Sequence, residues 1–274
     1  MKKSKYGFIF KVVLIGNVLS VLIPTLFLIN SAFRKSGQIL SKPLAISSSL
    51  DMSNFVTVFQ NGNFKSYVIN SLLVTLFSEI IIITFGLLAG YALAKYRFKL
   101  NKLIYLVFLS GLLIPAKLAL VPLFIQLKNM NLLDSRIGLI LVYSAGALPA
   151  AVFIFTSFIK ALPTDLDNAA RIDGASEIQI FMKIMIPLIM PVTSIVGIYT
   201  AIPIWNDFLL PLVFIRDSSK MTIMQGLSVF FGEHANDWGA LFAGLAVAAL
   251  PLLFLYIVLS KQFIRGLTNG AIKG

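Results

Sequence analysis

Long apolar runs dominate this sequence of 274 residues and restrict what it can fold into. A helix needs about 20 mainly apolar residues to cross the hydrocarbon core of a bilayer. Six segments meet this requirement, at residues 12–30, 68–94, 103–125, 137–159, 187–205 and 238–260. Because a chain in lipid must satisfy its backbone hydrogen bonds internally, the sequence predicts an all-α membrane protein with six transmembrane helices in one domain, 1–274.

Composition agrees with this prediction and excludes several kinds of site. Only 12% of residues are charged, against about 25% in soluble domains. The chain has no cysteine and one histidine, His234, so a disulfide framework or a cysteine–histidine metal site is excluded. The net charge of +12 comes from basic residues beside apolar runs, which indicates contact with anionic lipid and no binding of nucleic acid.

Two of the predicted spans carry features that bear on their packing. The span 68–94 ends in GLLAGYALAK, whose small residues suit close approach of another helix. The span 103–125 is interrupted by Pro115, Lys117 and Pro122, so we expect this helix to bend or end early. The first span follows a basic start without a small-residue cleavage site and is read as a retained helix.

Basic residues set the expected orientation. If the N-terminus is inside, fourteen of the 23 Lys and Arg residues fall on the inner side, and four of them lie in the short loop 95–102. Such enrichment is typical of cytoplasmic loops. The sequence therefore predicts that both termini and the segment 163–187 are cytoplasmic.

The segment 163–187 is the longest stretch of mixed polarity between apolar runs. Thr164 is placed to cap a short helix, and Asp165 and Asp167 stand in its first turn, where carboxylates complement the helix dipole. We expect this helix to run to about Asp173.

A joint and a second helix follow. Gly174 tolerates the turn that other residues resist, and Ser176 with Gln179 forms a capping-box pattern. Ala169 and Ala170 would keep one face slim enough for another protein's groove to approach. An amphipathic helix resting on the inner membrane surface fits the same spacing.

The motif LDNAARIDGAS, followed by PLIMP at 187–191, resembles the Glu-Ala-Ala loop of binding-protein-dependent ATP-binding-cassette (ABC) importers. The strings IPAKLALVPLF, WNDFLLPL and GLTNGAIKG extend the resemblance, which lies with the sugar-permease group that includes the smaller permease subunit of the maltose transporter. The resemblance implies a second permease subunit, an ATPase dimer, an extracytoplasmic sugar-binding protein and a bacterial or archaeal cytoplasmic membrane. Nucleotide-driven closure of that dimer would push the loop and switch the spans between inward-facing and outward-facing states.

No GxxxxGK[ST] phosphate-binding loop occurs in the chain. ATP and magnesium are therefore expected on the partner ATPase, with no cofactor and no catalytic residue in this chain, which is not predicted to be an enzyme.

The resemblance also implies residues for coupling to the ATPase. In the loop these are Asp165, Asp167, Asn168, Ala169, Ala170, Asp173, Gly174 and Ala175. In the tail they are Gly266, Asn269, Gly270 and Lys273, which otherwise read as a frayed terminus. Asn168 departs from the family, which usually has glutamate there. Either Asp165 or Asp167 substitutes for that carboxylate, or the ATPase contact is weaker.

Polar residues within or at the ends of spans leave two questions open. Tyr199, Trp205, Asn206 and Asp207 would contribute to a sugar pathway or gate, or Trp205 anchors at the interface while Asn206 and Asp207 end a helix. Glu79, a carboxyl group inside the second span, would serve an ion-coupled secondary transporter or channel, or is simply paired with a polar neighbour.

Overall fold

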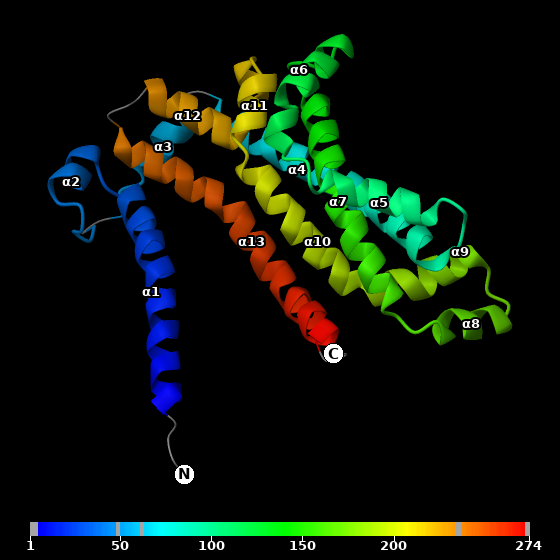
Figure 1. The fold of residues 1–274 in the computed structure, drawn as a ribbon. Helices are drawn as coiled ribbons and strands as arrows, with labels where there is room; N and C mark the ends of the chain where they lie inside the picture. Colours follow the sequence, from blue (N-terminus) through cyan, green and yellow to red (C-terminus); the bar gives the residue numbers. More distant parts are fainter. Residues whose placement is uncertain (1–4, 48–49, 61–62, 234–236, 272–274) are drawn as a thin grey trace. The chain divides into compact units, whose positions relative to one another are not determined.

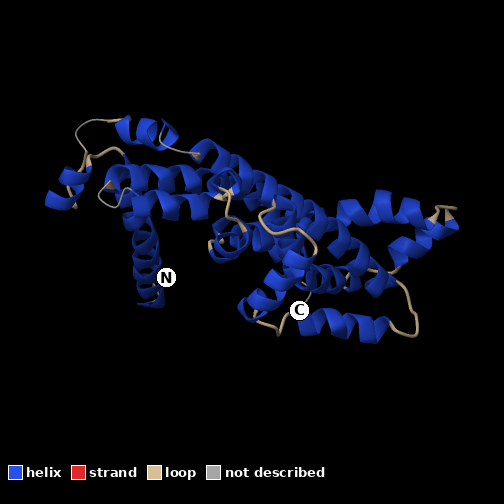
Figure 2. Ribbon diagram, turned by 90° about the horizontal axis from the view of Figure 1, so that it is seen from above, coloured by secondary structure: helices blue, strands red, loops and turns tan. Residues whose placement is uncertain are grey.

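A computed structural model describes residues 5–47, 50–60, 63–233 and 237–271. Every regular element among them is a helix, which confirms the all-α prediction (Figure 2). The α-helices in Figure 1 are α1 (Lys5–Ala32), α2 (Ser36–Ser41), α3 (Ser53–Gln60), α4 (Phe64–Lys95), α5 (Asn101–Gly111), α6 (Leu120–Asn129), α7 (Arg136–Lys160), α8 (Asp165–Ile172), α9 (Glu177–Gln179), α10 (Ile186–Asn206), α11 (Leu209–Phe214), α12 (Ile223–Glu233) and α13 (Trp238–Ala271). Short 3-10 turns occupy Ala116–Ala119 and Ser218–Lys220, and a π-helical segment, Ile180–Met185, joins α9 to α10.

Five helical stretches in the described part of the chain are long and apolar enough to cross a membrane. They are Ile9–Ala32, Phe64–Lys95, Arg136–Lys160, Glu177–Asn206 and Trp238–Ser260. Each contains one of the predicted spans: the last coincides with the predicted 238–260, and the other four extend beyond their predicted ends.

The predicted span 103–125 is wrong as a single helix. α5 ends at Gly111, and the backbone is extended at Pro115, where φ is −63° and ψ is 120°. A 3-10 turn follows, and α6 begins at Leu120 with Pro122 in its first turn, where a helix tolerates proline best. The expectation that the prolines end this helix early is thus confirmed. The eleven residues of α5 reach only about 16 Å, half the hydrocarbon thickness of about 30 Å.

The chain forms two compact units, residues 1–65 with 226–251, and residues 66–225 with 252–274. In the first unit the polar stretch after α1 folds around Arg34. Its guanidinium group is buried and donates to the carbonyl oxygens of Gln38, Lys42 and Pro43. These bonds satisfy a buried cation and fix the turn that holds α2.

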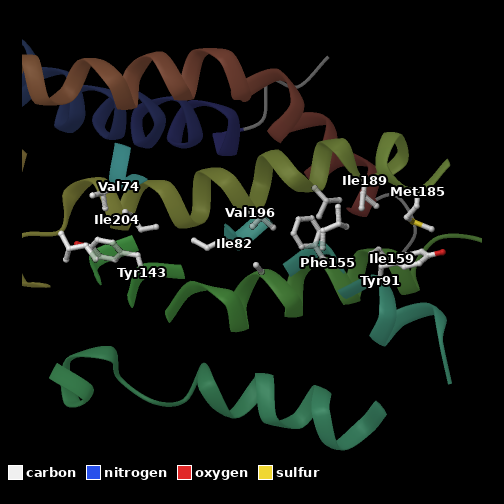
Figure 3. Packing of buried hydrophobic residues seen from close by; sticks show 14 of the residues in the cluster. Val74, Ile82, Tyr91, Tyr143, Phe155, Ile159, Met185, Ile189, Val196 and Ile204 are labelled. Carbon is white, nitrogen blue, oxygen red and sulfur yellow. The ribbon is translucent and has the colours of Figure 1, made fainter. Parts of the chain in front are cut away.

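The core of the second unit lies where α7 and α10 pack beside α4. Phe155 and Ile159 of α7, Ile189 and Val196 of α10 and Ile82 of α4 are all almost completely buried and belong to one cluster (Figure 3). In a bilayer, burial among helices brings little hydrophobic gain, so close packing must hold these helices together.

Gly90 permits that packing between α4 and α7. A Cβ atom at this position would lie 2.7 Å from Cβ of Phe155 and 3.1 Å from the backbone nitrogen of Thr156. Neither atom can move without moving α7. The expectation that the small residues at the end of this span serve close helix packing is therefore confirmed.

We predict that Gly90→Ala destabilises the protein by about 1–3 kcal/mol, because the new methyl group overlaps atoms fixed to the α7 backbone. Thermal unfolding of the purified protein in detergent would measure this. Gly146→Ala is the matched control, since nothing lies within 4 Å of a Cβ at Gly146 of α7. If Gly90→Ala unfolds no earlier than the control, the close contact between α4 and α7 is not required for stability.

Candidate functional site

The joint in the segment 163–187 is built by its backbone. α8 ends in a Schellman motif, in which Gly174 N–H donates to Arg171 O at 3.1 Å and Ala175 N–H donates to Ala170 O at 3.0 Å. Gly174 has φ of +81°, a conformation that costs other residues about 1–2 kcal/mol. The glycine joint predicted from the sequence is confirmed.

The two helices that flank this joint begin differently. Ser176 Oγ accepts from Gln179 N–H at 3.3 Å, and the Gln179 side chain accepts from Ser176 N–H at 2.8 Å, so the predicted capping box is present. Thr164 stands at the N-cap of α8 but makes no side-chain cap bond, because its backbone is already helical with φ −70° and ψ −20°. The predicted threonine cap is wrong.

A continuous helix leads from the joint into the membrane. α9, the π-helical segment Ile180–Met185 and α10 follow one another without a break, so Glu177 and Asn206 are the ends of one 30-residue stretch. π-Helical segments inside α-helices often occur at functional sites. Continuity of the second loop helix with the fifth predicted span is confirmed.

The loop is held against the end of α4. Lys95 Nζ lies 2.5 Å from Asp167 Oδ2, and Tyr96 donates from its hydroxyl to Glu177 Oε2 at 3.1 Å. Arg171 joins Glu177 across the glycine joint, with Nε 2.8 Å from Oε1. In Figure 1 α8 and α9 lie side by side at one end of α7 and α10.

These ion pairs differ in strength because they differ in exposure. The side chains of Lys95 and Asp167 are 9% and 6% exposed, whereas those of Arg171 and Glu177 are 45% and 46% exposed. Removing one partner of a buried pair typically costs about 3–5 kcal/mol, because the other charge stays buried without compensation. An exposed pair contributes about 0–1 kcal/mol. The Lys95–Asp167 pair therefore dominates the attachment of α8 to α4.

Two groups in the loop region outside the spans have shifted pKa values. The hydrogen bond with Glu177 raises the pKa of Arg171 above its ordinary value. Partial burial raises the pKa of Tyr96, and its hydrogen bond to the Glu177 carboxylate acts in the same direction. Both groups therefore keep their protons at neutral pH, as donors to the Glu177 carboxylate.

The remaining loop residues divide into an outer and an inner set. Asp165, Asn168, Ala169, Asp173 and Gly174 are exposed, Ala175 is half-buried, and Asp167 and Ala170 are buried. The idea that both alanines form one slim outer face is therefore wrong for Ala170, which packs inward. Asp167 already pairs with Lys95, which leaves Asp165 as the exposed acid of this turn.

Asp207 ends one helix and begins the next. Its Oδ1 accepts from Leu209 N–H at 3.1 Å, its Oδ2 accepts from Leu210 N–H at 3.2 Å, and Tyr143 donates to the same oxygen at 2.8 Å. This geometry favours the helix-ending interpretation of Asp207. Sequence reasoning did not pair it with Tyr143 of α7, which lies 64 residues away.

The other proposed pathway residues do not share one environment. Trp205 is 3% exposed and Tyr199 is 59% exposed, and Asn206 is exposed beside Asp207. Of the tail residues, Gly266, Asn269 and Gly270 belong to α13, whereas Lys273 lies outside the described residues.

Glu79 has a polar neighbour inside the helix bundle. Thr200 of α10 donates to Glu79 Oε1 at 2.7 Å and also lies 2.8 Å from Val196 O. Oε2 of Glu79 is buried and accepts no hydrogen bond from the described residues. The interpretation of Glu79 as a carboxyl group paired within the bundle matches this geometry.

A polar cluster closes the opposite end of this unit. Asp134, whose φ is 54°, accepts from Arg216 N–H and Asp217 N–H at 3.0 Å each and lies 3.2 Å from Lys220 Nζ. Burial alone would raise the pKa of Asp134, but these hydrogen bonds lower it overall. The carboxylate thus stays ionised and ties the α6–α7 turn to the chain after α11.

Comparisons with known proteins fit this architecture. The family described as "Binding-protein-dependent transport system inner membrane component" matches residues 82–269. The diacetylchitobiose uptake system permease protein NgcG of Streptomyces coelicolor is 36% identical over 255 residues, covering 92% of this chain and 84% of the relative. The melibiose/raffinose/stachyose import permease protein MelC of Bacillus subtilis is 33% identical over 253 residues, covering 92% and 91%.

Solved structures show the same fold. A chain in the crystal structure of a bacterial ABC transporter involved in the import of the acidic polysaccharide alginate matches with a TM-score of 0.82 and 20% identity, over 94% of this chain and 96% of that chain. A second match, with a TM-score of 0.69 and 16% identity over 95% and 96% of the two chains, is to an alginate ABC transporter in complex with a periplasmic protein. Because the family match spans most of the sequence and the relatives are covered almost end to end, the chain belongs to the inner membrane components of binding-protein-dependent transport systems.

Proposed function

We propose that the chain is a membrane-spanning permease subunit of an ATP-driven importer of a sugar or oligosaccharide. Relatives named for the uptake of diacetylchitobiose and of melibiose, raffinose and stachyose support a carbohydrate substrate. Its partners are a second permease subunit, an ABC ATPase dimer that binds ATP and magnesium, and an extracytoplasmic sugar-binding protein. A crystal structure with a periplasmic protein bound to a transporter of the same fold supports the last of these.

Orientation follows from the basic residues and from the loop contact. With both termini in the cytoplasm and with α5 and α6 together making the third crossing, the loop 95–102 and the segment 163–187 face the cytoplasm. The contacts of Lys95 and Tyr96 with the segment support this, since they require both to lie at the same end of their unit.

The observation that carries the coupling role is the exposed apolar surface of the loop. Ile172 and Ile178, on either side of the glycine joint, are 86% and 75% exposed, and Ala169, three residues before Ile172 on α8, is exposed as well. Apolar side chains grouped on a segment outside the lipid mark a protein-binding surface. This surface is the docking site for the ATPase, and closure of the ATPase dimer moves the loop and with it α7 and α10, driving alternating access.

The function is tested by reconstitution. We expect proteoliposomes that hold this chain, the partner permease and the ATPase to take up sugar only with ATP inside and the sugar-loaded binding protein outside. Labelled disaccharides and trisaccharides would be the probes. Uptake without the ATPase, driven by an ion gradient, would contradict the proposal.

Loop docking has a separate test. We expect Ile172→Ser to weaken recovery of the ATPase with the purified permease about tenfold, the loss of about 1.4 kcal/mol typical of an interface anchor. Its exposure means that folding is unaffected. Thr164→Ala is the control, because Thr164 is exposed and makes no side-chain cap bond. Equal ATPase recovery from the Ile172 variant and the control would show that the ATPase binds elsewhere.

A variant of Glu79 distinguishes ATP-driven import from ion-coupled transport. We expect Glu79→Gln to retain most ATP-driven uptake, because an amide oxygen still accepts the hydrogen bond from Thr200. Uptake measured with and without a protonophore would show the same rates. Loss of uptake in both the variant and the protonophore-treated wild type would instead support a secondary transporter.

A further inference from the structure

α4 is not next to the loop 163–187 in the sequence, although both lie at the same end of their unit. The loop continues directly into α10 and is separated from the end of α7 by only two residues, so any displacement of the loop reaches these two helices through the backbone. α4 is separated from the loop along the chain by α5, α6 and α7. Force from the loop can reach α4 there only through side chains.

The side chains that meet at this point form what we name the α4 clamp, defined as Lys95 and Tyr96 with Asp167 and Glu177. Lys95 stands in the last turn of α4, and Asp167 stands in the first turn of α8. Each charge complements the dipole of its own helix, so the pair joins the negative end of one helix to the positive end of another.

Aromatic packing lies beside this ion pair. The ring centroids of Tyr91 and Phe181 are 4.8 Å apart, and those of Tyr91 and Tyr96 are 5.8 Å apart. Phe181 belongs to the π-helical segment that continues into α10. The end of α4 therefore contacts both the first loop helix and the start of the helix that leads into the membrane.

Burial makes the clamp suitable for transmitting force. The Lys95 and Asp167 side chains are almost fully withdrawn from solvent, so salt and water screen their attraction little. Separating them would leave two buried charges unpaired, so the energy would rise steeply over a small displacement. The exposed Arg171–Glu177 pair, by contrast, stays within the loop and stiffens its joint.

We infer that the α4 clamp makes the loop 163–187 move three membrane helices, α4, α7 and α10, and that Lys95 and Asp167 are positioning residues for coupling. The inference rests on the proposed importer function. It adds that transport fails when α4 lags behind α10, even though the ATPase still docks and hydrolyses ATP.

The Glu79–Thr200 hydrogen bond joins α4 to α10 at a second place along these helices. Leu88 of α4 and Met190 of α10 each lie between that bond and the clamp. They are 47% and 58% exposed, and the natural chain contains no cysteine. Spin labels on cysteines at these two positions would report the distance between α4 and α10 in the assembled transporter.

In the otherwise wild-type complex we expect this distance to stay unchanged when ATP is added, because both helices follow the loop. In Asp167→Asn or Lys95→Met we expect it to shift with ATP, with about tenfold fewer sugars transported per ATP hydrolysed. The swapped pair, Lys95→Asp with Asp167→Lys, should restore both readouts in part, because it re-forms the direct ion pair while each charge now opposes the dipole of its helix. Lys220→Met, which removes the half-buried partner of Asp134, is the control and should change neither readout.

Two outcomes would overturn the clamp. One is an unchanged transport ratio and an unchanged α4–α10 distance in the single variants. The other is loss of transport with lower thermal stability and no ATP-dependent shift in distance, since that is a purely structural role. Failure of the wild-type complex to import sugar with ATP would instead refute the proposed function, so the two failures are distinguishable.

Discussion

The absence of water in the bilayer core is the constraint on which this structure depends. Backbone groups in lipid must bond to one another, so the regular elements of the described chain are helices, and three of the breaks between them coincide with a proline, a glycine and a polar side chain. The extended residue Pro115 separates α5 from α6, and Gly174 closes α8 by a backbone motif. Asp207 supplies two acceptors where α10 gives way to α11. Each interruption therefore carries its own compensation.

Polar contacts between helices have more effect here than they would in a soluble protein. The α7–α10 core is apolar, and so are its lipid surroundings. Apolar packing therefore determines how closely the helices approach, but does little to determine which helices pair. Choice comes from the few polar bonds between distant segments: Glu79 with Thr200, Tyr143 with Asp207, and Lys95 with Asp167. Together these three contacts join α4 to α10, α7 to the end of α10, and α4 to α8.

Much of the fold and part of the site could be predicted from the sequence, because both depend on local rules. Apolar length located five spans, and the capping-box and glycine patterns located the joint at Gly174. Prolines showed that the third span would break but not that it becomes two short helices, since that depends on the packing of neighbours. The partners of Asp167 and Asp207 could not be predicted, because Lys95 and Tyr143 lie more than 60 residues away and no local pattern marks such pairs. In the sequence, the basic segment 95–102 indicated only orientation, although Lys95, its first residue and the last of α4, also holds the loop 163–187.

The Schellman motif at Gly174 has a consequence for how this surface can change over evolution. Its shape is fixed by backbone hydrogen bonds, by the inward-facing residues Asp167 and Ala170 and by the exposed Arg171–Glu177 pair, so the other outward-facing side chains bear little of that task. Asn168 can therefore stand where the resemblance to the importer loop implies a glutamate, without altering the turn. If the loop docks on an ATPase as proposed, such a surface would let the two proteins exchange charges one position at a time and diverge as a matched pair, while the backbone of the joint stays the same.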